Sequence, residues 1–218
     1  DDSVAKAMPG IKDVFTMKTY NEDYQLQWSD VNTYPDLVVV VGNSTWEVLN
    51  AKKSLKIEWQ PTGSDDAKIP TALESTSGHM ALMREMQTKK SDVKRKDGDP
   101  EAVFKKAAKI IERSYSCPFL AHNCVEPMNF FADVTEGKAE LAGPTQTPEF
   151  MEKTVAARLG MELEQVDIQM TRMGGGFGRR LYGHFLVEAA VISQKVKAPV
   201  KLIYTREDDM TTGIYRPA

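Results

Sequence analysis

The stretch Met173-Gly174-Gly175-Gly176-Phe177-Gly178-Arg179-Arg180 sets the fold of the second half of the chain, because it joins an expected strand to an expected helix. The strand is expected at 166–172 and the helix at 183–196, where apolar side chains recur on one face. Glycine permits positive φ and close approach of a ligand, so successive backbone N–H groups can converge on an electronegative atom. Both arginines can add bidentate contacts to phosphate, and Phe177 would form an aromatic wall beside the ligand.

Two alternatives to a cofactor loop remain open at this point. The stretch lacks the Lys-Ser/Thr ending of a nucleotide P-loop, and it does not match the G-x-G-x-x-G spacing of dinucleotide-binding folds. It could serve a non-enzymatic module that grips a phosphate-bearing ligand or a partner protein, or it could be a plain turn. A plain turn needs neither an aromatic surface nor two guanidinium groups, so we favour a binding role.

A second group of polar residues lies upstream of the loop. Gln146 begins the turn before an expected helix at 147–159, so its amide could donate to a ligand oxygen near the amino end of that helix. His122 and Glu126 are four residues apart, but Pro127 follows at once, so we do not expect a metal pair on one helix face. We interpret His122 as a structural histidine.

The remaining chain reads as alternating short elements. The run 36–41 predicts a buried strand, 45–53 a helix and 55–59 a second strand, which together fit a crossover unit. A linker is expected at 61–70, a solvated basic loop at 89–96 and a turn at Glu136-Gly137. Methionines at helical spacing in 71–86 predict core packing. Further expected elements are a helix starting at Asp99-Pro100 and strands at 110–117, 129–134, 138–141 and 200–204.

Composition excludes several classes of protein. The 218 residues are 41% hydrophobic and 27% charged, which is typical of a globular chain with a core. The net charge of -3 gives no basis for a nucleic-acid partner. No apolar run approaches the roughly 20 residues of a membrane helix. Cys117 and Cys124 could form one disulfide, but we expect two buried free thiols, because their neighbours are apolar. The chain begins at Asp1 and stops at Ala218 just after a patterned segment, so we expect a fragment of a longer protein.

The order of these motifs resembles one enzyme family. His122…Glu126-Pro127, Pro144-Thr145-Gln146, the glycine loop and Arg206…Ala218 are together similar to the xanthine oxidase and aldehyde oxidase superfamily. Within it, the Phe-Gly-Arg-Arg ending most resembles the beta subunits of isoquinoline 1-oxidoreductases. The resemblance implies an α+β fold with three parts: a partial hammerhead-type α/β domain at 1–62, a linker and helical segment at 63–108, and the first part of a molybdopterin-binding domain at 109–218.

The resemblance also implies a function. Members insert a water-derived oxygen into an N-heterocycle or aldehyde and pass electrons to a 2Fe-2S alpha subunit. By resemblance the cofactor is molybdopterin with molybdenum, in the cytosine dinucleotide form of bacterial relatives. It would contact Gln146 and a run of loop residues, which are Gly175, Gly176, Phe177, Gly178 and Arg179. None of these is expected to ligate the metal directly.

The chain also departs from the family pattern. Leu181 stands where xanthine-converting members carry a substrate-binding glutamate, so purine specificity is not expected. The family's general-base glutamate belongs to a late motif beyond Ala218, so no catalytic residue is expected here, and the 218 residues alone should be inactive and hold no cofactor. Relatives with this loop ending are often periplasmic or membrane-associated, and the sequence leaves a cytoplasmic location open.

Overall fold

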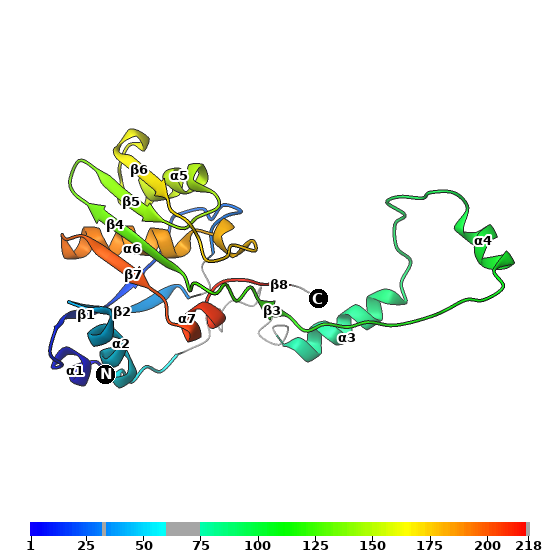
Figure 1. The fold of residues 1–218 in the computed structure, drawn as a ribbon, viewed down its shortest axis with the longest axis horizontal. Coiled ribbons are helices and arrows are strands. Elements are labelled where there is room, and N and C mark those ends of the chain that lie inside the picture. The colour runs from blue at the N-terminus through cyan, green and yellow to red at the C-terminus, as the bar shows by residue number, and fades with distance from the viewer. Residues whose placement is uncertain (32–33, 60–74, 217–218) are drawn as a thin grey trace. The chain divides into compact units, whose positions relative to one another are not determined.

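The computed structural model describes residues 1–31, 34–59 and 75–216 (Figure 1). They form two units: Asp1–Glu58 with Leu120–Arg216, and Trp59–Phe119. The mixed α+β class expected from the sequence is confirmed. In chain order the first unit contains α1 (Ser3–Lys6), β1 (Ile11–Lys18), β2 (Asp36–Gly42), α2 (Thr45–Ser54), β3 (Leu120–Ala121), β4 (Asn129–Val134), β5 (Ala139–Gly143), α5 (Pro148–Leu159), η1 (Leu163–Gln165), β6 (Val166–Met170), η2 (Arg179–Leu181), α6 (His184–Val196), β7 (Val200–Ile203), α7 (Arg206–Thr211) and β8 (Tyr215–Arg216).

A four-stranded sheet in the order β6-β5-β4-β7 forms the centre of the first unit. β5 runs parallel to β6 through the α5 crossover, whereas β4 is antiparallel to both β5 and β7. Alternate residues of β4 are buried, as a strand covered on one face requires. Thr135 and Lys138 close the expected β4–β5 turn, and Gly160 ends α5 in the left-handed conformation, as predicted from the sequence.

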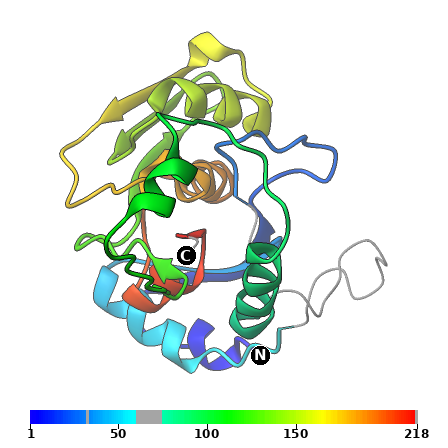
Figure 2. The same ribbon diagram turned by 90° about the vertical axis from the view of Figure 1, so that its right-hand side faces the viewer.

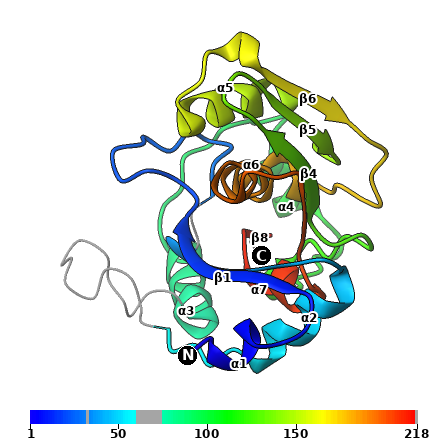
Figure 3. The same ribbon diagram turned by 90° about the vertical axis from the view of Figure 1, so that its left-hand side faces the viewer.

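Helix α6 is the most deeply buried element of this unit. Ten consecutive residues from His184 to Ser193 are buried. Figures 2 and 3 show the helix end-on between the four-stranded sheet and the β1–β2 ribbon. Met17 and Tyr20 share its core with Phe130 and Phe185. A helix that is apolar on nearly all sides needs such cover, so the glycine loop leads into a rigid anchor.

The crossover expected from 36–59 is wrong. β2 pairs instead with the preceding β1, antiparallel, and 55–59 forms no strand. The run 37–41 is apolar at every position because the ribbon is covered on both faces: Val38 and Val40 pack in a small core with α1 and α2, and Val39 packs toward the larger core. Lys56 exchanges backbone hydrogen bonds with Asp1, which keeps this segment out of the sheet.

The second unit corrects further expectations. It contains α3 (Thr76–Gln87) and α4 (Pro100–Lys106), and Asp99 caps α4 as predicted. No residue of α3 is buried, so its methionines do not form the expected core. Residues 71–74 of the expected helix lie outside the described residues. The segment 110–117 is not a strand, because no neighbouring strand is available to it among the described residues of the unit.

The two cysteines lie in different environments. Cys117 is exposed and Cys124 is buried, so the prediction of two buried thiols is wrong for Cys117. The expected linker at 61–70 lies outside the described residues. In the described ranges, no helix has the length and apolarity that a bilayer crossing requires.

Candidate functional site

The sheet brings four chain segments to one edge. Because β5 and β6 are parallel, their carboxyl ends meet there, followed by Pro144-Thr145-Gln146 and by the glycine loop. β4 is antiparallel to its neighbours, so its amino end and the preceding Glu126 arrive at the same edge. The carboxyl end of β7 leads there into α7. Ligands commonly bind outside the carboxyl ends of strands, so this edge is the candidate site.

The structure brings Gln146 against the glycine loop, as the sequence analysis expected. The Gln146 Oε1 accepts a hydrogen bond from the Gly178 N–H at 3.2 Å. A Cβ at Gly176 would lie 2.7 Å from this oxygen, so only glycine permits the close approach. The Gln146 Nε2 donates to no protein acceptor in the described part of the chain, and the residue is exposed. Its amide can therefore donate to a ligand.

The glycine loop carries backbone donors that the protein does not use. The N–H groups of Gly175, Gly176 and Phe177 bond to no acceptor among the described residues. Phe177 and Gly178 have positive φ values of +50° and +87°, and Phe177 is 67% exposed. Adjacent N–H groups in such a turn form a concave donor site for an electronegative atom.

The two arginine side chains of the loop are buried. Arg180 is fully buried, and its guanidinium donates to the carbonyl oxygens of Gly175 and Pro144 and to both the carbonyl and carboxylate of Glu126. Arg179 is 2% exposed and donates to the Thr212 carbonyl. The expectation that both guanidiniums contact phosphate is therefore wrong: protein acceptors occupy Arg180, and Arg179 is buried against Thr212, His184 and Asp209.

Glu126 was considered from the sequence only as a metal partner of His122, and its contact with the glycine loop was not predicted. Its Oε2 accepts from the Gly174 N–H at 2.7 Å and from Arg180 Nη2 at 3.1 Å. Burial raises the pKa of this carboxyl, but the hydrogen bonds from Gly174 and Asn129 and the charge of Arg180 outweigh burial and hold the pKa below its ordinary value. The signal in the sequence is the Arg179-Arg180 pair itself, because buried guanidiniums require carboxylates nearby.

Comparison with known proteins identifies the family. The model of the molybdopterin cofactor-binding domain matches residues 83–218, which is more than half of the chain. The chain belongs to the molybdopterin cofactor-binding domain family. It is 27% identical to isoquinoline 1-oxidoreductase subunit beta of Brevundimonas diminuta over 100% of this chain and 26% of that protein. The resemblance inferred from the loop ending is thereby confirmed.

Other relatives place the domain in a wider group. It is 31% identical to a membrane-bound aldehyde dehydrogenase [pyrroloquinoline-quinone] of Gluconacetobacter polyoxogenes over 82% of this chain and 23% of that protein. The aldehyde oxidoreductase of Desulfovibrio gigas has the same fold, with a TM-score of 0.61 at 20% identity, covering 98% of this chain and 26% of that one. The chain spans 23%, 14% and 28% of the length of the first three relatives.

The residues of the domain fit a cofactor with electronegative atoms. Three loop N–H groups and the Gln146 amide offer donors, and Phe177 offers an exposed ring. The Gly176 position is a cradle that a Cβ would fill. A donor set of this kind suits hydrogen bonding around a cofactor rather than direct metal ligation, which needs oxygen, nitrogen or sulfur lone pairs.

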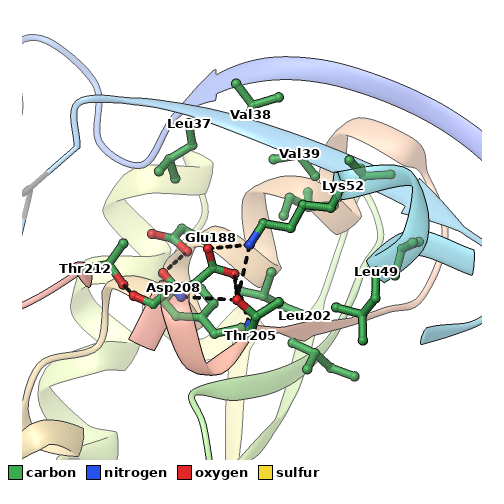
Figure 4. A pocket seen from close by; sticks show the side chains of 15 residues that line it. Leu37, Val38, Val39, Leu49, Lys52, Glu188, Leu202, Thr205, Asp208 and Thr212 are labelled. Atoms are coloured by element: carbon green, nitrogen blue, oxygen red, sulfur yellow. Dashed lines mark hydrogen bonds and ion pairs between the residues drawn. The ribbon is translucent and has the colours of Figure 1, made fainter. Parts of the chain in front are cut away.

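A buried acid lies behind the site in α6. Glu188 accepts hydrogen bonds from the hydroxyls of Tyr204 at 2.5 Å and Thr19 at 3.3 Å. Burial raises its pKa from an ordinary 4.5 to about 7, against these hydrogen bonds and the charge of Arg179. Glu188 also lines a cavity of about 160 Å³ between β2 and β7, where Lys52 pairs with Asp208 (Figure 4). No glycine-loop residue lines that cavity, so the candidate site does not depend on it.

Replacing Glu188 by glutamine should change how the opening of α6 depends on pH. In the wild type the folded carboxyl holds its proton up to about pH 7 and the unfolded one only to about 4.5, so stability falls as pH rises between these values. Glu188→Gln lacks this fall. The free energy of opening α6 in Glu188→Gln, minus that in the wild type, should therefore increase by about 3 kcal/mol between pH 4.5 and 8. Hydrogen exchange of α6 peptides measures this.

His184 makes the stability of the domain depend on pH in the opposite direction, which gives an internal check. Burial, with the charge of Arg179, lowers its pKa from 6.5 to about 3, so stability is lost as pH falls below 6.5. The two groups oppose each other between pH 4.5 and 6.5, and the wild type should vary little there. If the wild-type and Glu188→Gln curves run parallel, Glu188 does not titrate as described.

Proposed function

We propose that this domain is part of the large subunit of a molybdenum hydroxylase that oxidises an N-heterocyclic or aldehyde substrate with oxygen derived from water. The observation that carries the proposal is the hydrogen bond that holds Gln146 against the glycine loop, in which three N–H groups bond to no acceptor among the described residues. The family membership supports molybdopterin with molybdenum as the cofactor. When bound, that cofactor supplies the two-electron oxidation.

The roles of this chain's own residues follow from their positions. Gln146 and the backbone of 175–179 would hold the cofactor by hydrogen bonds, and Phe177 would exclude water from one side of it. Arg179 would take part through its backbone, since its guanidinium is buried. The general base would come from the family's late glutamate motif, so the 218 residues alone should neither turn over nor retain cofactor.

The substrate class rests on the relatives and on one residue. The names of similar proteins include isoquinoline 1-oxidoreductase, nicotinate dehydrogenase and aldehyde oxidase, which supports aromatic N-heterocycles or aldehydes. Leu181 in place of an acidic side chain argues against purines, because an apolar group cannot pair with their polar edge. The relative named for pyrroloquinoline quinone belongs to the same comparison, but the matching family model is the molybdopterin one.

The proposal extends to the whole protein. We propose that 1–62 is a partial hammerhead-type domain, 63–108 a linker and helical segment, and 109–218 the first part of the molybdopterin-binding domain. Electrons would leave through a 2Fe-2S alpha subunit, and the cofactor would carry the cytosine dinucleotide. A copurifying iron–sulfur protein encoded beside this gene would support the partner.

Isotope labelling tests the reaction directly. The full-length enzyme with its partner is given isoquinoline, nicotinate or an aromatic aldehyde, with an artificial electron acceptor, in water enriched in oxygen-18. The hydroxylated or carboxylic product should carry one labelled oxygen, as read by mass spectrometry. Label that enters only from dissolved dioxygen would refute a water-dependent hydroxylase, and a protein without molybdenum would refute the cofactor.

A further inference from the structure

The guanidinium of Arg179 is a buried anchor for the glycine loop. Arg179 directly follows Gly178, and its side chain turns into the protein, where it is 2% exposed. Nη2 donates to the Thr212 carbonyl at 3.0 Å and lies 3.4 Å from His184 Nε2. Nε lies 3.4 Å from Asp209 Oδ1. The loop is thus connected through one side chain to the segment that carries α7.

The end of the α7 segment is shaped around this side chain. A Cβ at Gly213 would lie 2.8 Å from Arg179 Cζ and 3.0 Å from Nη1, so no side chain fits there while the guanidinium stays in place. Gly213 also has a φ of +106°, which places its backbone in a conformation that other residues rarely adopt. The backbone at residue 213 therefore leaves no room for a side chain beside the Arg179 guanidinium.

Asp209 neutralises the charge of the Arg179 guanidinium. Its side chain is 1% exposed, and it is the carboxylate within ion-pair distance of Arg179 in the described ranges. It also pairs with Arg206 Nη1 at 3.3 Å. A buried guanidinium that loses its carboxylate partner is strongly destabilised, because nothing then offsets its removal from water. Of the other titratable groups nearby, His184 is held neutral by burial and Glu188 bonds to Tyr204 and Thr19.

The Asp209 carboxylate is also connected, through Arg206, to the segment 123–125 that contacts the loop. Arg206 donates to the Asn123 Oδ1 at 3.0 Å and to the Val125 carbonyl at 2.8 Å. Between these two residues, the Cys124 thiol donates to the Gly176 carbonyl at 3.5 Å. Asp209 is therefore connected to the loop at two points, after Gly178 and beneath Gly176.

We propose that Asp209 is a positioning residue for the cofactor loop, which acts by fixing Arg179 against Gly213 and so holds Phe177 and the free N–H groups in place. The proposal rests on the proposed function for its consequence, since a displaced loop would no longer receive molybdopterin. The connection itself does not need a cofactor. The two can therefore be tested separately.

Hydrogen exchange on the full-length protein tests the connection. Asp209→Asn should raise the exchange rate of amides at 174–181 by at least about tenfold, because an unpaired buried charge promotes local opening. Asp208→Asn is the matched control: it lies on the same helix and loses the charge that pairs with Lys52, but it keeps the Thr205 cap, which bonds to the backbone N–H of residue 208, and no bond joins it to Arg179 among the described residues. Its loop exchange should stay at the wild-type rate.

A second variant displaces the Arg179 side chain by steric clash, without a change of charge. Gly213→Ala should also raise exchange at 174–181, because its Cβ displaces the guanidinium. Gly160→Ala is its control, since Gly160 shares a positive φ of +69° but has nothing within 4 Å of its Cβ. Loop exchange that is unchanged in Asp209→Asn, or that rises equally in both members of either pair, would overturn the proposal.

Two further readings distinguish positioning from a purely structural role. The double variant Arg179→Gln, Asp209→Asn leaves no unpaired charge in the interior, because the remaining partner of Asp209, Arg206, is 37% exposed and can be solvated. Its melting temperature should therefore recover while loop exchange stays fast and molybdenum content per subunit stays low. Recovery of all three would show that the pair only stabilises the fold. Fast loop exchange with full molybdenum content in Asp209→Asn would overturn the positioning role even where the connection holds. Failure of the proposed function would appear instead as a wild-type protein without molybdenum.

Discussion

Replacing Phe177 by alanine in the full-length protein should lower substrate turnover by about 100-fold, because the loss of a wall that orients a reactive group has effects of this size. The fold should be retained. The ring is 67% exposed, so its removal leaves little buried surface unpacked and should change stability by less than about 1 kcal/mol. Steady-state kinetics and a thermal melt measure the two quantities.

Phe104→Ala provides a matched comparison for this variant. Phe104 is also a phenylalanine and is 59% exposed, but it lies on α4 in the second unit. Its replacement should leave turnover per molybdenum unchanged. Wild-type turnover in Phe177→Ala would mean that the glycine stretch only makes a turn, which is the plainest alternative to a cofactor loop.

Replacing Arg180 by alanine should destabilise the domain by about 3 kcal/mol, because the fully buried guanidinium is lost together with its hydrogen bonds, and each buried acceptor left without a donor costs about 1–3 kcal/mol. The guanidinium satisfies the carbonyls of Gly175, Pro144 and Glu126 and the Glu126 carboxylate. Without it, the buried Pro144 carbonyl and the half-buried acceptors of Gly175 and Glu126 lose this donor. The loss should appear as a lower unfolding midpoint and as fast amide exchange across 173–183.

Arg95→Ala separates this effect from the removal of any arginine. Arg95 pairs with Asp97 at the surface, where the two side chains are 83% and 73% exposed. A pair of this kind contributes about 0–1 kcal/mol. If Arg180→Ala lowered stability no more than Arg95→Ala, the hydrogen bonds of Arg180 would not be what stabilises the glycine loop.

Much of the site could be predicted from local sequence. The glycine stretch between a strand and a helix, and Gln146 before the next helix, are local signals, and the structure brings the two together. The reason is that β5 and β6 are parallel, so the residues following each strand meet at one edge. The caps at Asp99 and Gly160 were also predictable, because capping depends on neighbouring residues alone.

What could not be predicted depends on contacts between distant segments. Glu126 and Asp209 lie far along the chain from the arginines that they neutralise, and their own neighbours carry no sign of the pairing. The run 37–41 indicates burial on both faces but does not say which strand pairs with it. The arginines themselves suggested phosphate contacts, since a guanidinium suits a carboxylate and a phosphate equally well.

The central claim is that Gln146 and the glycine loop together receive the cofactor. The most direct test compares the molybdenum content of two variants, Gly176→Ala and Gly137→Ala. Gly176→Ala would place a Cβ 2.7 Å from the Gln146 Oε1 and force the amide out of the loop, whereas Gly137 has nothing within 4 Å. Metal analysis of the full-length subunit should find wild-type molybdenum in Gly137→Ala and a loss of at least about tenfold in Gly176→Ala. Equal molybdenum in both variants would contradict the claim.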